Sequence, residues 1–194
     1  MRRVAVALLH FPVLDRAGQE VTTAVTNLDV HDIARSGYTY GIERYFVVHP
    51  IAAQRELVNR VREHWVTGSG RLRIPDRQEP MRAVQPVCDL ASACELWAAG
   101  EPMELWTTSA KVEDQSLEHA SARSLLRGDG PKVLLVFGTG WGLSPVVHTS
   151  STCRLAPIRS PRADGFNHLS VRAAAAILFD RLLGTEPRLE AGQL

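Results

Sequence analysis

The chain has 194 residues, of which 45% are hydrophobic and 22% are charged, and its formal net charge is +1. This composition is typical of a soluble globular domain, and no apolar run reaches the ~20 residues that a transmembrane helix needs. A net charge so near zero gives no electrostatic sign of a nucleic-acid partner. We therefore expect a single cytoplasmic domain over residues 1–194, without membrane contact.

The cysteines do not form a metal-binding pattern. They are Cys88, Cys94 and Cys153. No CxxC pair and no Cys/His zinc spacing is present, so we expect free thiols in a reducing compartment and no bound metal. A metal hydrolase built on His10, His49 and His148 is the alternative, but no pair among these histidines has ligand spacing.

Strand-like apolar runs alternate with helical patterns along the first half of the chain. Val4–Leu9 and Tyr45–Val48 predict buried strands, and the pattern between them predicts a helix that starts at Thr26. An apolar stripe over 51–65 predicts a second helix. The stretch 68–86, rich in Gly, Pro and Arg, is predicted to be a long loop, which in a compact domain is functional or mobile.

The second half continues this alternation. It predicts strands over 83–88, 104–109, 133–137 and 153–158, helices over 90–99, 116–127 and 169–183, and a short element over 146–150. Such an order is typical of a mostly parallel sheet with helices on both faces. The predicted fold class is therefore α/β, with ligands at the carboxyl ends of the strands.

A glycine-rich turn follows the most convincing strand. In VLLVFGTGWGLSP, residues 133–145, Gly138, Gly140 and Gly142 let the backbone approach a ligand closely. A dinucleotide fingerprint would need a long helix directly behind the turn and an acidic residue ~20 positions later, whereas Pro145 follows here. A tight turn that simply requires glycine is the structural alternative.

The last helix carries a run of small residues. In LAPIRSPRADGFNHLSVRAAAAILFDRLLG, residues 155–184, Ser170 can cap the helix and Ala173 to Ala176 allow very close packing. The close neighbour is either a ligand ring or another backbone, as in helix–sheet or dimer packing.

Taken together and in this order, these two segments resemble the second and third motifs of the SPOUT methyltransferases. The stretch TNLDVHDIARSGYTYGIERYFVV, residues 26–48, resembles the first motif, known from the SpoU-type enzymes. The resemblance implies a SPOUT fold with a deep trefoil knot, here over roughly 104–184, with 185–194 as a tail. It also implies a homodimer, bound S-adenosylmethionine and an RNA substrate, and the most similar subgroup is the bacterial tRNA (guanine-N1)-methyltransferase-like proteins.

The resemblance places the cofactor against three backbone segments and the start of the last helix. The expected cofactor-binding residues are Thr108, Ser109, Ala110, Gly138, Thr139, Gly140, Trp141, Gly142, Pro157, Ile158, Arg159, Asn167, His168, Leu169, Ser170 and Ala173. Two departures from the SpoU pattern stand out. The second motif has no glutamate, and the asparagine of the third motif is shifted to Asn167.

Three polar residues of the first motif are the catalytic candidates. Asn27, His31 and Arg35 are four positions apart and share one helix face. In SpoU-type enzymes the matching asparagine and arginine flank the RNA ribose, whereas His31 has no counterpart there. Because arginine almost never deprotonates in proteins, we expect Arg35 to stabilise a developing alkoxide and His31 or a phosphate to accept the proton.

The expected function is methyl transfer from S-adenosylmethionine to RNA, with tRNA favoured as substrate and 2′-O-ribose methylation favoured over base methylation. RNA contact is expected from arginines of the long loop and of the knot, namely Arg71, Arg73, Arg77, Arg82, Arg159, Arg162 and Arg172. For base methylation, the resemblance offers Asp164, which lies in a stretch comparable to the one that carries the catalytic aspartate of the tRNA (guanine-N1) enzymes. The alternatives are a regulatory protein that binds S-adenosylmethionine without transfer, and a methyltransferase whose substrate is not RNA.

Overall fold

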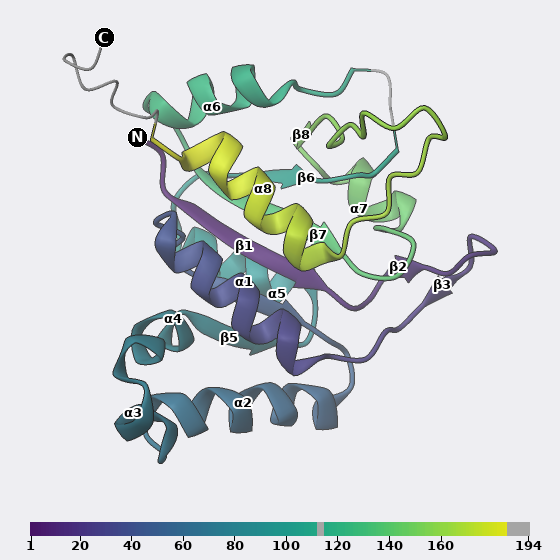
Figure 1. Ribbon diagram of the computed structural model, residues 1–194. Helices are drawn as coiled ribbons and strands as arrows, with labels where there is room; N and C mark the ends of the chain where they lie inside the picture. Colours follow the sequence, from purple (N-terminus) through teal and green to yellow (C-terminus); the bar gives the residue numbers. More distant parts are fainter. Residues whose placement is uncertain (112–114, 186–194) are drawn as a thin grey trace, which may run out of the picture.

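The computed structural model describes residues 1–111 and 115–185 (Figure 1). Its main feature is a six-stranded sheet in which every neighbouring pair is parallel. In spatial order the strands are β5 (Val84–Val87), β4 (Tyr45–Val48), β1 (Val4–Leu9), β7 (Lys132–Gly138), β6 (Met103–Thr107) and β8 (Cys153–Arg154). The predicted α/β class with a parallel sheet is confirmed. The predicted tail lies outside the described residues from 186 onward.

Helices cover both faces of the sheet. They are α1 (Asn27–Thr39), α2 (Ala52–Val66), α3 (Gly70–Arg73), α4 (Gln78–Arg82), α5 (Leu90–Ala98), α6 (His119–Arg127), α7 (Pro145–Thr149) and α8 (Val171–Leu183), with a 3-10 turn over Pro75–Arg77. In Figure 1, α1 and α8 lie side by side in front of β1, while α5 lies behind the sheet. No described helix is long and apolar enough to cross a membrane.

Alternation along the central strands explains the two layers. Val4, Val6 and Leu8 of β1 enter the core beneath α1, α6 and α8, whereas Ala5, Ala7 and Leu9 enter the core beneath α5 and α7. Successive side chains of a strand point to opposite faces, so a strand that is apolar throughout can fill both cores. This is why the continuous run Val4–Leu9 forms an inner strand.

The stretch predicted as a long loop, 68–86, holds α3, the 3-10 turn and α4 instead. Its anchors are Met81, which is fully buried in the larger core, and Arg77, whose guanidinium lies 4.6 Å from the centre of the Trp65 ring. Two adjacent buried residues, Pro80 and Met81, in a polar segment give no periodic signal that predicts a helix.

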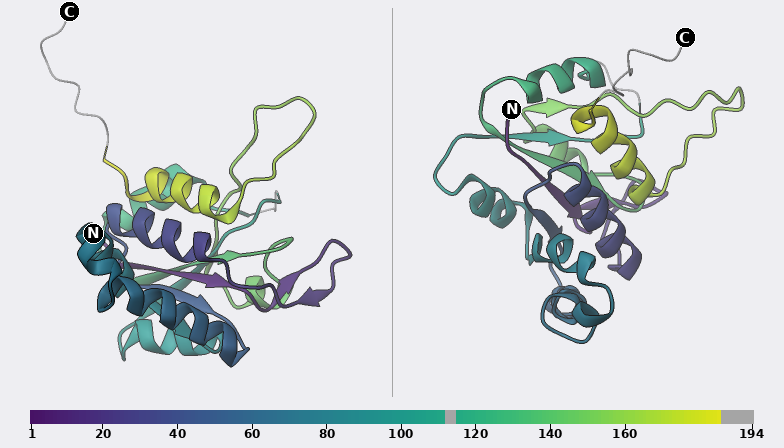
Figure 2. Two further views of the ribbon diagram at one scale, coloured as in Figure 1. Left: turned by 60° about the horizontal axis from the view of Figure 1, so that its bottom comes forward. Right: turned by 60° about the vertical axis from the view of Figure 1, so that its left-hand side comes forward.

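A short hairpin precedes α1. It consists of β2 (Val13–Leu14) and β3 (Glu20–Val21), and the carboxylate of Asp15 closes its turn by accepting from the amides of Ala17 and Gln19. The sequence analysis did not predict this hairpin, because strands of two residues leave no alternation to detect. Figure 2 (left) shows the hairpin and the 159–170 loop projecting from the same end of the molecule.

Candidate functional site

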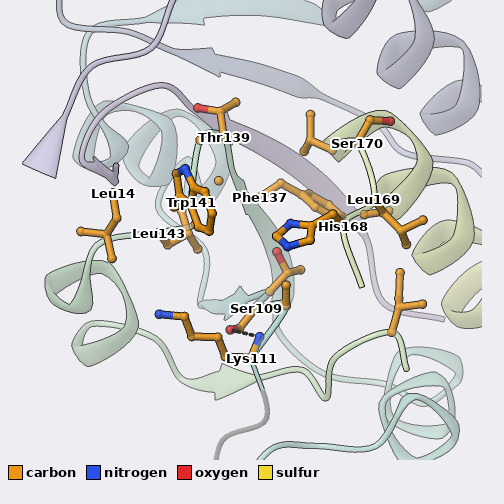
Figure 3. Close-up of a pocket in the computed structure, with 18 of the residues that line it drawn as sticks. Leu14, Ser109, Lys111, Phe137, Thr139, Trp141, Leu143, His168, Leu169 and Ser170 are labelled. Carbon is orange, nitrogen blue, oxygen red and sulfur yellow. Dashed lines mark hydrogen bonds between the residues drawn. The ribbon is translucent and has the colours of Figure 1, made fainter. Parts of the chain in front are cut away.

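A cavity of about 960 Å³ opens at the carboxyl ends of β7, β6 and β8. One wall is the glycine-rich turn after β7, a second is the backbone after β6 from Thr108 to Lys111, and a third is the first turns of α8 (Figure 3). This is the edge of the sheet at which the sequence predicted a ligand, and the volume lies at the upper end of the range of small-molecule sites.

The glycine-rich turn needs its glycines for close packing. A Cβ on Gly138 would lie 2.8 Å from the amide nitrogen of Leu143, and one on Gly140 would lie 2.8 Å from the carbonyl oxygen of Leu14. Gly140 and Gly142 also have φ values of +59° and +107°, which disfavour any other residue. The structural explanation for the glycines therefore holds, and the resulting turn forms a wall of the cavity.

The β2–β3 hairpin holds this turn from outside. The amide of Trp141 donates to the carbonyl of Leu14 at 2.8 Å, and the amide of Leu14 donates to the carbonyl of Gly142 at 2.9 Å. The hydroxyl of Ser144 also donates to the carboxylate of Glu20. These bonds fix the turn against a segment more than a hundred residues away in sequence.

Most of the residues expected to bind the cofactor line this cavity. They are Thr108, Ser109, Ala110, Gly138, Thr139, Gly140, Trp141, Gly142, Ile158, Asn167, His168, Leu169 and Ser170. Ser170 also caps α8 by accepting from the amide of Ala173 at 3.2 Å. The structure thus brings together residues that are up to sixty positions apart in the chain.

The other three expected cofactor residues lie elsewhere. Pro157 is buried behind the wall, and Arg159 is exposed and pairs with Glu118 at 2.9 Å. Ala173 is on the outer side of α8, and Ala174 lines the cavity in its place. A helix advances 100° per residue, so an error of one position in choosing the inward face moves a side chain to the other side.

Several lining residues were not predicted. They include Leu14 and Ala24 beside the hairpin, Thr26 and Asp29 of the α1 start, Lys111, Phe137, Leu143, Pro145, His148, Thr149, Arg154, Ala156, Gly165, Val171, Ala174 and Leu178. The α8 members follow the spacing of one helix face and could have been found from it. The hairpin members could not, since the hairpin itself left no signal.

Asp29 is a buried acid at the inner edge of the cavity. Its carboxylate accepts from Arg172 of α8 at 2.9 Å and from the hydroxyl of Thr26 at 2.6 Å, while the Thr26 hydroxyl caps α1 by accepting from the Asp29 amide. Asp29 is the one carboxylate among the described residues lining the cavity, and Arg172 neutralises it. Lys111 adds a positively charged side chain to the described lining of the cavity.

A chain of hydrogen bonds connects the glycine-rich turn to a buried histidine. The hydroxyl of Thr139 donates to the carbonyl of Leu9 at 3.0 Å, so the hydroxyl of Thr23, 2.5 Å away, donates to Thr139. His10 must then donate from Nδ1 to Thr23 at 3.0 Å. Burial, together with the neighbouring His49, lowers the pKa of His10 to about 4, so the ring is neutral.

The three catalytic candidates of α1 do not line the large cavity. Asn27 is exposed in the first turn. His31 accepts from the Trp65 indole at 3.1 Å, and burial, with Arg77 beside it, lowers the pKa of His31. Arg35 lies in a second hollow of about 530 Å³ between α1 and α8, which Asp32, Arg172 and Ala173 also line.

The arginines expected to contact RNA are divided among several environments. Arg71 and Arg73 are exposed on α3, and Arg77 stacks on Trp65. Ion pairs are formed by Arg82 with Glu79, Arg159 with Glu118 and Arg162 with Asp164. Arg172, held between Asp29 and Asp32, stabilises the packing of α1 against α8 rather than offering its charge to a partner.

Residues 1–111 and 115–185 contain no group of three or more metal-ligating side chains. The histidines considered for a hydrolase are engaged in local bonds. His49 donates to the carbonyl of Thr23 at 3.0 Å, and His148 bonds the hydroxyl of Thr107 at 3.1 Å.

Comparisons with known proteins show the family to which the chain belongs. Residues 3–184 match a family model described as SAM-dependent RNA methyltransferase. The chain is 43% identical over 185 residues to the tRNA (guanine-N(1)-)-methyltransferase of Nitratidesulfovibrio vulgaris, a match covering 94% of this chain and 42% of that protein. It therefore spans about two fifths of the length of the methyltransferase that it matches.

Two proteins of Aquifex aeolicus extend the comparison. One, an uncharacterized protein, is 35% identical over 181 residues, covering 92% of this chain and 87% of that protein. The other is the solved structure of the TrmH/SpoU tRNA modifying enzyme, which superposes with a TM-score of 0.55 at 13% identity and covers 94% of this chain and 75% of that one. At that identity the likeness shows a shared fold.

Proposed function

Because the chain belongs to the family of SAM-dependent RNA methyltransferases, we propose that it transfers a methyl group from S-adenosylmethionine to RNA, with the cofactor in the cavity beside the glycine-rich turn. The observation that carries this proposal is the convergence of the turn, the 108–111 backbone and the start of α8 on one cavity. S-adenosylmethionine supplies an electrophilic methyl group, so the protein must position two reactants and accommodate one proton.

The cavity suits the parts of this cofactor. Ala156, Ile158 and Leu169 offer an apolar surface for a purine ring, and the backbone at 108–110 and 138–140 offers hydrogen-bonding groups for its edge. Lys111 can pair with the carboxylate of the amino-acid part. Since Arg172 neutralises Asp29, no unpaired carboxylate among the described lining residues would repel the carboxylate of the cofactor.

Two groups of an RNA could accept the methyl group. A ribose 2′-oxygen is favoured by the match of Asn27 and Arg35 to the SpoU pattern. A guanine base is favoured by the name of the N. vulgaris relative, a tRNA (guanine-N(1)-)-methyltransferase. For a base, Asp164 would have to take a proton, but the hydrogen bond from Arg162 lowers the pKa of Asp164 and makes it a weak base. We therefore propose ribose methylation of a tRNA, in the cytoplasm.

The site would be completed by a second copy of the chain. Arg35 is exposed on the outer face of α1, and in the same hollow Ala173 and Ala176 of α8 present only small side chains. Small residues allow another backbone to approach closely, and Leu28 on the same helix is 59% exposed. We propose a symmetric homodimer through α1 and α8, in which Arg35 of one subunit serves the cavity of the other, and a trefoil knot over roughly 104–184.

Titration calorimetry with S-adenosylmethionine and S-adenosylhomocysteine tests the cofactor site first. Micromolar binding that is lost in Gly140→Val is expected, because the added side chain meets Leu14 and requires a left-handed φ. Gly100→Val is the matched control, since Gly100 also has a left-handed φ, +82°, but lies away from the cavity. Binding of neither ligand would overturn the proposal.

Methyl transfer is then measured with a labelled donor on tRNA and rRNA, followed by nuclease digestion and mass spectrometry. A label on a ribose-methylated nucleoside of tRNA is the expected result. A label on a base would contradict ribose methylation but would still show that the chain is an RNA methyltransferase. Cofactor binding without transfer to any RNA would favour the regulatory alternative.

A further inference from the structure

Three aromatic rings gather at the mouth of the cavity. Trp141 comes from the glycine-rich turn, while Phe166 and His168 come from the loop before α8. The ring centres of Trp141 and His168 are 5.8 Å apart, and those of Phe166 and His168 are 5.4 Å apart. Figure 3 shows the Trp141 and His168 side chains side by side over the centre of the cavity. We call these three residues the aromatic cluster.

The aromatic cluster is exposed to an extent that folding does not explain. Trp141 is 52% and Phe166 is 58% exposed, and neither belongs to the two hydrophobic cores formed by the described residues. By contrast, Trp97 and Trp106 are buried. Contiguous exposed apolar groups beside a cavity mark a surface that another molecule covers.

The loop that carries Phe166 and His168 is ordered by its own bonds. Arg162 donates two hydrogen bonds to Asp164, whose carboxylate accepts from the amide of Phe166 at 3.1 Å. The side chain of Asn167 donates to the carbonyl of Ile158 at 2.7 Å. These bonds hold the backbone beside Phe166 and His168, and a loop ordered before binding lowers the entropy cost of binding a flat ligand.

The ring geometry indicates which kind of ligand fits. Trp141 and His168 are inclined by 76° and Phe166 and His168 by 58°, so neither pair is a parallel stack, and the Trp141 and Phe166 side chains remain exposed. An open ring face binds another planar ring by stacking, and unpaired nucleobases are recognised in this way because every base has such a face.

We propose that the aromatic cluster is a stacking platform for an unpaired base of the RNA substrate, and that it selects single-stranded or looped RNA over a duplex. This inference rests on the proposed function, since it takes RNA as the partner. Trp141 and His168 line the cavity, whereas Phe166 lies outside it. A base stacked on Phe166 would therefore lie next to the nucleotide that receives the methyl group at the cavity.

The test uses the tryptophan emission of the full chain with two RNA probes, a short oligoadenylate and a blunt duplex. The oligoadenylate is expected to quench emission and to bind more tightly than the duplex. Phe166→Ala should weaken its binding by about 5- to 150-fold, the range that corresponds to loss of one stacking contact. Trp141→Phe should retain most of the affinity but lose most of the quenching, which assigns the signal to Trp141.

Leu72→Ala is the matched control, because Leu72 is 81% exposed on α3 and lies away from the cavity. It should leave RNA affinity unchanged. Calorimetry with S-adenosylmethionine separates the two proposals: Phe166→Ala should keep cofactor affinity, so loss of RNA binding alone supports the platform. Equal binding of both probes, or unchanged oligoadenylate affinity in Phe166→Ala, would overturn it. Absence of cofactor binding in the unaltered protein would instead count against the proposed function.

Discussion

Arg172 in the first turn of α8 and Asp29 in the first turn of α1 form an ion pair of 2.9 Å at the inner edge of the cavity. The Asp29 side chain is 9% exposed and that of Arg172 is 30% exposed. The pair joins two helices that are distant in sequence and carry the first and third motifs. The ion pair also neutralises the charge of the Asp29 carboxylate, which would otherwise face a ligand in the cavity.

Replacing Arg172 by Met should therefore destabilise the fold. The change leaves the Asp29 carboxylate buried without its partner, and because Arg172 is partly exposed to solvent we expect a loss of about 1–3 kcal/mol rather than the larger penalty of a fully buried pair. Urea unfolding measures it. Arg159→Met, which breaks the exposed pair with Glu118, is the control and should change stability by less than about 0.5 kcal/mol. Equal effects would contradict this role of Arg172.

Stability should depend on pH through His10. Its folded pKa of about 4 lies below the ordinary value of 6.5, so the unfolded chain takes up a proton first as pH falls. Stability is fully present above pH 6.5 and is lost between pH 6.5 and 4, by about 3 kcal/mol for this shift. His31 and His49, whose pKa values are also lowered by burial, act in the same direction.

Urea unfolding of the unaltered protein and His10→Asn, each at pH 7.5 and 5, measures this effect. The asparagine amide can still donate to Thr23 but does not titrate, so the variant should lose less stability on acidification. His64→Asn, an exposed change on α2, should keep the full dependence. An identical loss in His10→Asn and the unaltered protein would exclude His10 as a source.

Gly138→Ala should impair the cofactor site. Its new Cβ would lie 2.8 Å from the amide nitrogen of Leu143 and 3.0 Å from the carbonyl carbon of Gly142, so backbone atoms of the turn must move. We expect S-adenosylmethionine affinity to fall by at least about tenfold in calorimetry. Gly128→Ala is the control, because the nearest atom to its Cβ would be an ordinary 3.5 Å away. Unchanged affinity would show that this wall does not contact the cofactor.

Arg35→Ala should reduce the rate of methyl transfer without affecting cofactor affinity. If Arg35 stabilises a developing alkoxide, its removal should lower kcat by about 10²- to 10³-fold, the cost of removing one such donor. Arg60→Ala, on the exposed side of α2, should retain full activity. Because the site is proposed to form between subunits, mixing Arg35→Ala with a Gly140→Val subunit should restore activity in the heterodimer. No recovery would exclude the shared site.

The strands were the most predictable part of the fold. Val4–Leu9 and Tyr45–Val48 match β1 and β4 to the residue, because short continuous apolar runs have abrupt ends. The predicted strand 153–158 shrinks to Cys153–Arg154, since the amide of Leu155 still bonds Thr107 of β6 but the amide of Ala156 bonds Leu117, outside the sheet. A run of apolar residues shows burial but does not show which neighbour each amide will meet.

The sequence predicted the candidate site only in those segments whose backbone conformation requires particular residues. The glycine-rich turn and the start of α8 carry local signals, glycine spacing and a capping serine, and both line the cavity. The orientation of α1 residues was not predictable in the same way. The spacing of Asn27, His31 and Arg35 places them on one face of α1. Which neighbour contacts that face depends on α2, whose Trp65 donates a hydrogen bond to His31.

The β2–β3 hairpin is hydrogen-bonded to the glycine-rich turn, so segments from both the N-terminal and the C-terminal part of the chain are needed to form the cavity. The amides of Leu14 and Trp141 exchange bonds across the two segments, and Val13 forms a bridge with Leu143. A fragment carrying both C-terminal motifs but lacking the first 25 residues would thus have the right sequence signature and an incomplete wall. Ligand binding should protect the Leu14 amide from hydrogen exchange along with that of Trp141, although only Trp141 belongs to a recognisable motif.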